Sequence, residues 1–320
     1  MAKIYPVFIP HLACKNDCIF CNQRKISGTL DVITPKSLYE KLKAENLKDT
    51  EIAFYGGSFT GIEKDLMIEY LSVAREFTNS IRLSTRPDYI STSILDILKE
   101  YGVKTIELGV QSLDDEVLKT AKRGHTRADV FNAVSLVKQY NFTLILQMMI
   151  GLPNDTTKKA LKTANEIVSL KPYGVRIYPV ITLNETQLKE MLLAKEYTPL
   201  SLNEAVSLSA EISILFINNN IEIIRTGLHN EDGLQNDIVA GPFHPAFGEL
   251  VFNKIYLNII EKNMPIFSTS LTIYCNPQDI SKVIGHKKCN AIYLKEKYNI
   301  NIKVKGKTNI KKYNLEIVGD

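Results

Sequence analysis

Three cysteines lie within eight residues near the start of the chain: Cys14, Cys18 and Cys21. No histidine follows them at zinc-finger spacing, and no fourth cysteine is near. A structural zinc site has four protein ligands, and an iron–sulfur cluster is usually held by four thiolates. Three thiolates on one short segment therefore predict a cubane cluster with one iron left to a ligand that is not protein. The alternatives are three unrelated cysteines or an incomplete zinc knuckle.

Glycine-containing and polar segments recur further along the chain, all but one of them at the expected end of a strand, and residues 123–126 lie between two expected helices. Glycine at such a place lets the backbone approach a ligand closely. In a parallel sheet with helices outside, functional residues gather at the carboxyl ends of the strands. These segments are residues 54–58, 84–88, 107–112, 123–126, 151–153 and 177–179.

The elements that would position these segments alternate along the chain between apolar strands and amphipathic helices. Thr34 and Pro35 are typical of a helix start, and Gly102 is typical of a position just past a helix end. The pattern predicts an α/β fold: a partial (β/α)6 barrel of the TIM type. Strands are expected at 4–10, 51–55, 81–85, 105–110, 143–150, 174–180 and 221–226, and helices at 35–44, 66–77, 92–101, 114–122, 127–140, 157–170 and 202–218.

The alternation breaks after Gly227, where glycine and proline punctuate the chain. We expect three parts: a barrel over residues 1–232, a barrel-closing linker with a helix near 247–262 over 233–268, and a small α+β domain over 269–320. The last part is basic, with ten lysines and one acid, Glu296, between Lys282 and Lys312. A basic face of this kind suits a polyanion, although a solvated lysine-rich surface is an equal alternative.

Composition limits the class of protein. With 45% hydrophobic and 23% charged residues among 320, the chain has the make-up of a soluble globular protein. It contains no apolar run of 18 residues and no secretory signal at its start, so no membrane association is expected. We expect a cytoplasmic protein, since thiols stay reduced there and a cluster persists.

The cysteine spacing and the strand-end segments together resemble the radical S-adenosylmethionine (SAM) superfamily. Within it they resemble the catalytic subunit of Elongator and its bacterial relatives, and more distantly the oxygen-independent coproporphyrinogen oxidases. The resemblance covers about residues 4–227. It implies that Cys14, Cys18 and Cys21 hold a [4Fe–4S] cluster whose open iron binds SAM.

The same resemblance implies where SAM lies. Phe20 and Tyr178 match positions beside the adenine, and Gln111 and Arg123 match residues that hold the ribose and carboxylate. Ser84 stands where the oxidases have Glu, and Gln147 where they have Asp. The full set of SAM contacts implied is Phe20, Tyr55, Gly56, Gly57, Ser84, Gln111, Arg123, Gln147 and Tyr178.

The implied chemistry belongs to the cofactors. One electron enters the cluster, SAM is cleaved to methionine and a 5′-deoxyadenosyl radical, and the radical abstracts hydrogen from a substrate. A one-electron donor of the flavodoxin or ferredoxin type is the expected partner. No catalytic side chain beyond the cluster ligands is identified, and the C–H bond attacked is not specified by the sequence.

Residues 283–304 resemble the helix–loop–helix–strand core of a KH domain, which clamps nucleic acid with a Gly-x-x-Gly loop. Gly285 is kept, but Lys288 stands at the second glycine. Gly285, Lys287 and Lys288 are therefore candidate RNA contacts, and a structural lid or dimerisation module is the alternative.

Other candidates favour structural roles. Cys275 and Cys289 are expected to be small buried hydrophobes rather than cluster ligands, and His125 a packed or capping residue. His244 and Glu249 could bind polar substrate groups, but an ordinary packed turn is the preferred interpretation.

The leading hypothesis is a radical SAM enzyme that acts on RNA, most plausibly a tRNA base. No room for the Elongator acetyltransferase domain remains after Gly227, so a carboxymethylation that uses acetyl-CoA is not expected. The alternatives are a radical SAM enzyme acting on a small molecule or tetrapyrrole, and a non-catalytic iron–sulfur protein that binds RNA.

Overall fold

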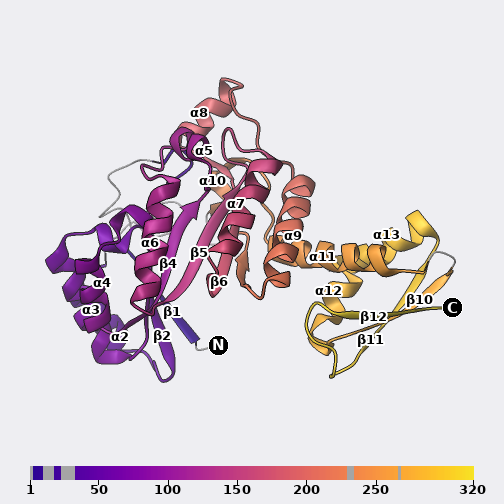
Figure 1. Cartoon of the computed structure of the whole chain (residues 1–320), viewed down its shortest axis with the longest axis horizontal. Coiled ribbons are helices and arrows are strands. Elements are labelled where there is room, and N and C mark those ends of the chain that lie inside the picture. Colours follow the sequence, from indigo (N-terminus) through magenta and orange to yellow (C-terminus); the bar gives the residue numbers. More distant parts are fainter. Residues whose placement is uncertain (1–2, 10–17, 23–32, 229–233, 266–267) are drawn as a thin grey trace. The chain divides into compact units, whose positions relative to one another are not determined.

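The computed structural model describes residues 3–9, 18–22, 33–228, 234–265 and 268–320 (Figure 1). Contacts group the chain into two compact units. The first comprises Met1–Ser201 and Phe216–Phe243, and the second comprises Leu202–Leu215 and His244–Asp320. None of the described helices is long and apolar enough to cross a membrane.

The first unit is built on a curled sheet of seven parallel strands, in the order β1-β2-β3-β4-β5-β6-β8. Six crossovers join the seven strands, which confirms the expected α/β half-barrel. The strands are β1 (Lys3–Phe8), β2 (Thr50–Tyr55), β3 (Ile81–Thr85), β4 (Val103–Gln111), β5 (Thr143–Ile150), β6 (Gly174–Pro179) and β8 (Glu222–Thr226). Its helices are α2 (Pro35–Lys43), α3 (Lys64–Phe77), α4 (Thr92–Glu100), α5 (Asp115–Thr120), α6 (Arg127–Gln139), α7 (Thr157–Ser169), α8 (Gln187–Leu193) and α10 (Leu234–Asp237). Helix α9 (Leu202–Asn218) falls mostly in the second unit, which includes Leu202–Leu215.

Local sequence signals end these elements as expected. Thr34 caps α2 by accepting a hydrogen bond from the backbone N–H of Ser37, and Pro35 occupies the first turn. Gly102 follows α4 with φ +80°, a conformation that glycine adopts without a Cβ penalty. A short antiparallel pair, β7 (Thr182–Leu183) and β9 (Ile238–Ala240), lies outside the main sheet.

Side-chain alternation gives the sheet two different faces. Ile106, Leu108 and Val110 of β4 are fully buried, as are Leu146 and Met148 of β5. Helices α4, α6 and α7 pack on these strands (Figure 1), and each fully buried leucine contributes roughly 1.5–3 kcal/mol. The intervening residues lie on the inner, concave face and include the polar Glu107 and Gln147 beside the apolar Ile145.

The second unit contains a three-stranded sheet of order β11-β10-β12. Its elements are α11 (Phe247–Asn263), β10 (Ser270–Cys275), α12 (Ile280–Ile284), α13 (Cys289–Tyr298), β11 (Asn301–Gly306) and β12 (Leu315–Gly319). Strand β10 pairs parallel with β11 and antiparallel with β12. The order helix–loop–helix–strand from α12 to β11 is the order expected of a KH-like core.

The second unit begins earlier than the range 269–320 that the sequence suggests for a small domain. Tyr256, Leu257 and Ile260 of α11 enter the same apolar core as Leu271 and Ile273 of β10. Because α11 supplies one wall of this core, the expected boundary near residue 268 falls inside one packed unit. The helix expected over residues 247–262 is therefore part of the second unit rather than a linker.

Candidate active site

The cysteine segment is held against the carboxyl edge of the half-barrel by backbone hydrogen bonds. The N–H of Ile19 donates to the carbonyl of Ala121 at 3.3 Å, and the N–H of Leu188 donates to the carbonyl of Ile19 at 2.8 Å. The N–H of Cys21 donates to the carbonyl of Cys18 at 3.0 Å, which forms a tight turn between the two cysteines. Cys14 lies outside the described residues.

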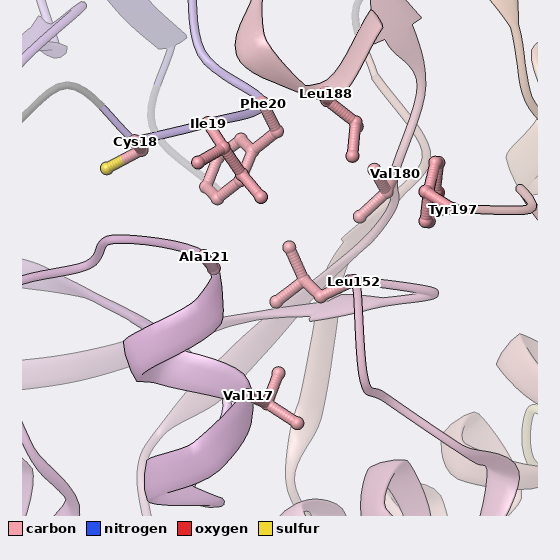
Figure 2. Packing of buried hydrophobic residues seen from close by; sticks show 9 residues of the cluster. All are labelled: Cys18, Ile19, Phe20, Val117, Ala121, Leu152, Val180, Leu188 and Tyr197. Atoms are coloured by element: carbon pink, nitrogen blue, oxygen red, sulfur yellow. The ribbon is translucent and has the colours of Figure 1, made fainter. Parts of the chain in front are cut away.

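Apolar side chains surround the segment between Cys18 and Phe20. Ile19 and Phe20 point into a buried cluster, and Leu152 and Leu188 line it (Figure 2). Its other members are Val117, Ala121, Val180 and Tyr197. Phe20 is thus part of a dry apolar cluster beside the cysteines, and its role beside adenine stays a prediction. A hydrophobic shell of this kind limits solvent access to a metal site and so affects its potential.

Arg123 connects the cysteine segment to strand β4. Its Nη1 donates to Sγ of Cys18 at 3.2 Å, and its Nη2 donates to the carbonyl of Gly109 at 2.8 Å. The side chain is buried, and its Nε–H has no hydrogen-bond partner within the described part of the chain. A buried donor without a partner costs stability unless a ligand completes it, so this guanidinium fits a bound anionic or carbonyl group.

Gly109 and Gln111 lie beside that guanidinium at the end of β4. Gln111 has a φ of +63°, and its buried Oε1 has no partner within the described residues. A Cβ added to Gly109 would lie 3.1 Å from Nε2 of Gln111 and 3.3 Å from Nη2 of Arg123. Glycine therefore leaves room for two polar side chains that each keep an unused hydrogen-bonding group.

The glycine pair after β2 has a backbone reason. Gly56 has a φ of +99°, and a Cβ there would lie 3.2 Å from the backbone nitrogen of Ile9. The N–H of Ile9 donates to the carbonyl of Tyr55 at 2.7 Å, so β1 approaches this turn closely. Gly57 follows at the same edge, and Ser58 is buried at the start of a 3₁₀ turn.

Arg86 is a buried arginine that the sequence interpretation left without a role. Its Nε and Nη2 donate to the two carboxylate oxygens of Asp88 at 2.9 and 2.8 Å. Its Nη1 is buried with no partner within the described residues. Ser84, which was expected to contact SAM, lies on the preceding strand, two residues before Arg86.

A charged network occupies the concave face of the half-barrel. The Glu107 carboxylate, 0% exposed, accepts from Nε and Nη2 of Arg176 at 2.7 and 2.9 Å. It also accepts from Nη1 of Arg82 at 3.1 Å, from Nε2 of Gln147 at 2.8 Å and from the Tyr55 hydroxyl at 3.1 Å. Burial alone would raise the pKa of Glu107, but its bonds to Arg176, Gln147 and Arg82 outweigh burial and lower the pKa.

Three members of this network were not identified from the sequence: Arg82, Glu107 and Arg176. Each is a charged residue that lies between two buried apolar residues of its strand. That pattern is the signal that could have found them, because a charge in a buried strand needs a partner on the same face. Tyr55, Gln147 and Tyr178 lie on this face too.

His125 is a packed residue, as expected. Its Nε2 lies 3.2 Å from the carbonyl of Val110. Burial, together with the charge of Arg123, lowers the pKa of His125 to about 4. His125 is therefore neutral near pH 7.

The loop between α12 and α13 has an unusual backbone. Gly285 has a φ of +90°, and a Cβ there would lie 2.6 Å from Sγ of Cys289. Lys287 and Lys288 have φ values of +50° and +64°, which non-glycine residues rarely adopt. Asn290 supports the loop by donating to the carbonyl oxygens of Asn253, Val283 and Lys282.

The remaining candidate residues are Cys275, Cys289, His244 and Glu249. Cys275 is buried in the core of the second unit, which confirms its structural role. Cys289 is exposed, so the expectation that it is buried is wrong: it stands at the first position of α13, next to the loop. The Nδ1 of His244 accepts from the N–H of Ala246 at 3.0 Å, as in a packed turn. Glu249 lies 3.3 Å from Nδ1 of His286.

A parallel half-barrel with a cysteine segment at its carboxyl edge, and with buried donors there that have no partner within the described residues, is typical of a cofactor-dependent α/β enzyme. The sequence model of the radical SAM superfamily matches residues 8–167, and that of the Radical_SAM C-terminal domain matches residues 172–256. The first match covers half of the chain, and the chain belongs to the radical SAM superfamily. Membership implies a [4Fe–4S] cluster and SAM as cofactors.

Several curated proteins are similar to this chain over about half its length. An uncharacterized protein of Methanocaldococcus jannaschii is 31% identical over 54% of this chain and 56% of its own length. A tRNA uridine(34) acetyltransferase of the same organism is 31% identical over 53% of this chain and 31% of its own. Elongator complex protein 3 of Saccharomyces cerevisiae is 31% identical over 49% of this chain and 29% of its own length. The chain thus matches about a third to just over half of these relatives.

Solved structures establish the fold. The archaeal Elongator protein of Methanocaldococcus infernus, with its N-terminus deleted, superposes with a TM-score of 0.61 at 22% identity over 82% of this chain and 63% of its own. Coproporphyrinogen III oxidase of Escherichia coli superposes with a TM-score of 0.52 at 16% identity over 68% of this chain and 53% of its own.

Proposed function

We propose that this protein is a radical SAM enzyme that modifies RNA, and specifically tRNA. The observation that carries the proposal is the group formed by Cys18, Arg123 and Gln111 at the carboxyl edge of the half-barrel. It combines a cysteine of the three-cysteine segment with a buried donor, Nε of Arg123, and a buried acceptor, Oε1 of Gln111, that lack partners within the described residues.

The cofactors fit these residues. Cys14, Cys18 and Cys21 would hold the cluster, and Arg123 and Gln111 would bind the carboxylate and ribose of SAM, consistent with a planar guanidinium that binds carboxylates in a fork. When bound, the cluster and SAM together supply a carbon-centred radical that removes a hydrogen atom from the substrate. Phe20 and the apolar cluster around it would exclude water, and the glycines at 56, 57 and 109 would let the ligand approach the backbone.

The proposed RNA substrate is supported by the relatives and by the second unit. Two of the similar proteins are named tRNA uridine(34) acetyltransferase and Elongator complex protein 3. The loop of Gly285, Lys287 and Lys288 would contact RNA phosphates, with the two lysines as point charges. In this proposal the half-barrel within residues 1–232 carries the chemistry, and the loop within residues 269–320 contacts RNA, while α11 belongs to the core of the second unit. A ferredoxin or flavodoxin in the cytoplasm would supply the electron.

Cluster reconstitution under anaerobic conditions tests the enzyme class. Protein loaded with iron and sulfide is mixed with SAM and dithionite, and 5′-deoxyadenosine is measured by chromatography. We expect cleavage in the wild type and none after Cys14→Ala, Cys18→Ala or Cys21→Ala, which should also lose the brown chromophore. Cys289→Ala is the matched control, because that thiol is exposed and distant in sequence from the cysteine segment. A cluster that survives loss of Cys18 would refute the ligand assignment.

The substrate is tested separately, by comparing tRNA nucleosides from a deletion strain and its parent by mass spectrometry. We expect one modified nucleoside to be absent from the deletion strain and restored by the purified enzyme with SAM and reductant. Normal tRNA nucleosides together with an accumulating tetrapyrrole or other small molecule would replace the RNA proposal with the small-molecule alternative. A loaded protein that binds tRNA but never cleaves SAM would instead be a non-catalytic cluster protein.

A further inference from the structure

The Glu107 carboxylate joins side chains from four strands of the half-barrel. Its hydrogen-bond donors are Arg82 on β3, Gln147 on β5, Arg176 on β6 and Tyr55 on β2. Each carboxylate oxygen accepts at least two hydrogen bonds, at 2.7–3.1 Å. The carboxylate therefore fixes the orientation of all four neighbours at once.

Charge balance shows that the network does not serve to attract a charged ligand. Arg82 is shared between Glu107, at 3.1 Å, and Glu51, at 2.7 Å, while Arg176 binds Glu107 at 2.7 Å. Two arginines thus face two carboxylates. Nor is stability a sufficient reason, because apolar residues of similar volume often stabilise a core as well as buried ion pairs do. Orientation of neighbouring groups is the effect that remains.

The consequence is clearest for Gln147. A carboxylate only accepts hydrogen bonds, so the amide nitrogen of Gln147 must face Glu107, 2.8 Å away. The amide oxygen of Gln147 is thereby turned away from the carboxylate. Since Gln147 is only partly buried, this oxygen is left to accept from a donor group on the ligand side.

Tyr55 is fixed in a different way. Its hydroxyl donates to Glu107 at 3.1 Å and accepts from Nη2 of Arg176 at 3.2 Å. The polar end of Tyr55 is thus occupied, which leaves its ring as the part that can contact a ligand. The guanidinium of Arg176 lies 5.7 Å from the centre of that ring.

We infer that Glu107 is a positioning residue for SAM: it holds the Gln147 amide so that its carbonyl oxygen accepts from a ligand donor such as a ribose hydroxyl. The inference rests on the proposed function, because it takes SAM as the ligand of this edge. With Glu107 opposite, the Gln147 amide offers a hydrogen-bond acceptor to the ligand.

SAM titration into cluster-loaded, unreduced protein tests the inference without turnover. We expect Glu107→Gln to weaken SAM binding about tenfold, the loss of one oriented hydrogen bond, because an amide at 107 can either donate to or accept from Gln147. Gln147→Leu should weaken binding to a similar degree. The double variant should bind no more weakly than Gln147→Leu alone, since Glu107 acts through Gln147.

Glu51→Gln is the matched control. Glu51 is a buried carboxylate of the same face that binds Arg82, Ser80 and Thr105, but neither Gln147 nor Tyr55. The Glu51→Gln variant should have a lower melting temperature than the wild type and an affinity for SAM within about twofold of it. A merely structural role for Glu107 predicts the same behaviour for both variants.

Three results would overturn the inference: unchanged affinity in Glu107→Gln, additive losses in the double variant, or wild-type affinity in Gln147→Leu. The SAM affinity of Gln147→Leu can still overturn the inference if Glu107→Gln does not fold. A loaded wild type that fails to bind SAM would instead refute the proposed function, and the inference with it.

Discussion

The Arg123 guanidinium bridges the Cys18 thiol and the Gly109 carbonyl, with 3.2 Å from Nη1 to sulfur and 2.8 Å from Nη2 to oxygen. The two contacts tie the cysteine segment to the end of β4. Because the third nitrogen, Nε, is buried without a partner within the described residues, the same side chain is available to a ligand. One arginine thus joins the proposed cluster site to the proposed SAM site.

Replacing Arg123 should separate charge from geometry. Lysine keeps the positive charge but has a single nitrogen, so Arg123→Lys cannot contact Cys18, Gly109 and a ligand together. We expect SAM cleavage to fall at least about tenfold, which corresponds to about 1.4 kcal/mol, while the cluster still forms. Arg127→Lys is the control, because Arg127 forms a partly exposed ion pair with Glu166. Equal activity of the two variants would contradict the role of Arg123.

Gly109→Ala should affect the site more than the fold. The new methyl group would lie 3.1 Å from Gln111 and 3.3 Å from Arg123, so both side chains must shift. We expect SAM affinity, measured by titration, to drop about tenfold through two displaced polar contacts. Gly174→Ala is a matched control. Gly174 is the first residue of β6, at the end of the strand away from the proposed SAM site, and a Cβ there would lie 2.8 Å from Ile224. That variant should lower the melting temperature without changing SAM affinity.

His125 should make stability depend on pH. Its pKa is lowered to about 4 in the folded protein, from 6.5, chiefly by burial. Between these values the unfolded chain binds the proton and the folded protein does not, so stability is complete above about pH 6.5 and is lost as pH falls toward 4. The loss is at most roughly 3 kcal/mol.

His125→Gln is the variant that tests this, since its amide can still donate to the Val110 carbonyl but does not titrate. Urea midpoints are compared between pH 7 and pH 4 for both proteins. We expect the wild type to lose more stability than the variant over this range. Parallel pH profiles would show that His125 does not titrate as stated.

Lys287 and Lys288 should matter for RNA binding because of where the loop holds them. We expect Lys287→Ala with Lys288→Ala to weaken tRNA binding and to reduce the slope of log affinity against log salt by about one to two. The control is Lys303→Ala with Lys305→Ala, which removes the same charge from exposed positions on β11 of the same unit. Equal losses in both pairs would indicate general electrostatic attraction instead of a loop site.

Much of the fold was predictable because its signals are local. The periodicity from β1 to β8 predicts each βα unit, and Thr34 and Gly102 mark the start of α2 and the end of α4 within a residue. The three-cysteine spacing likewise indicates a cluster without any structure, since three thiolates on one short segment can reach a single metal centre.

The contacts that organise the site depend on the tertiary structure. No spacing in the sequence shows that Arg123 contacts Cys18, 105 residues away in the chain. The sequence also cannot show that Arg82, Gln147 and Arg176 converge on Glu107, because sheet curvature and strand register place them on one face. A charged residue in an apolar strand indicates that a partner must exist. Only the packing of the strands decides which residue that partner is.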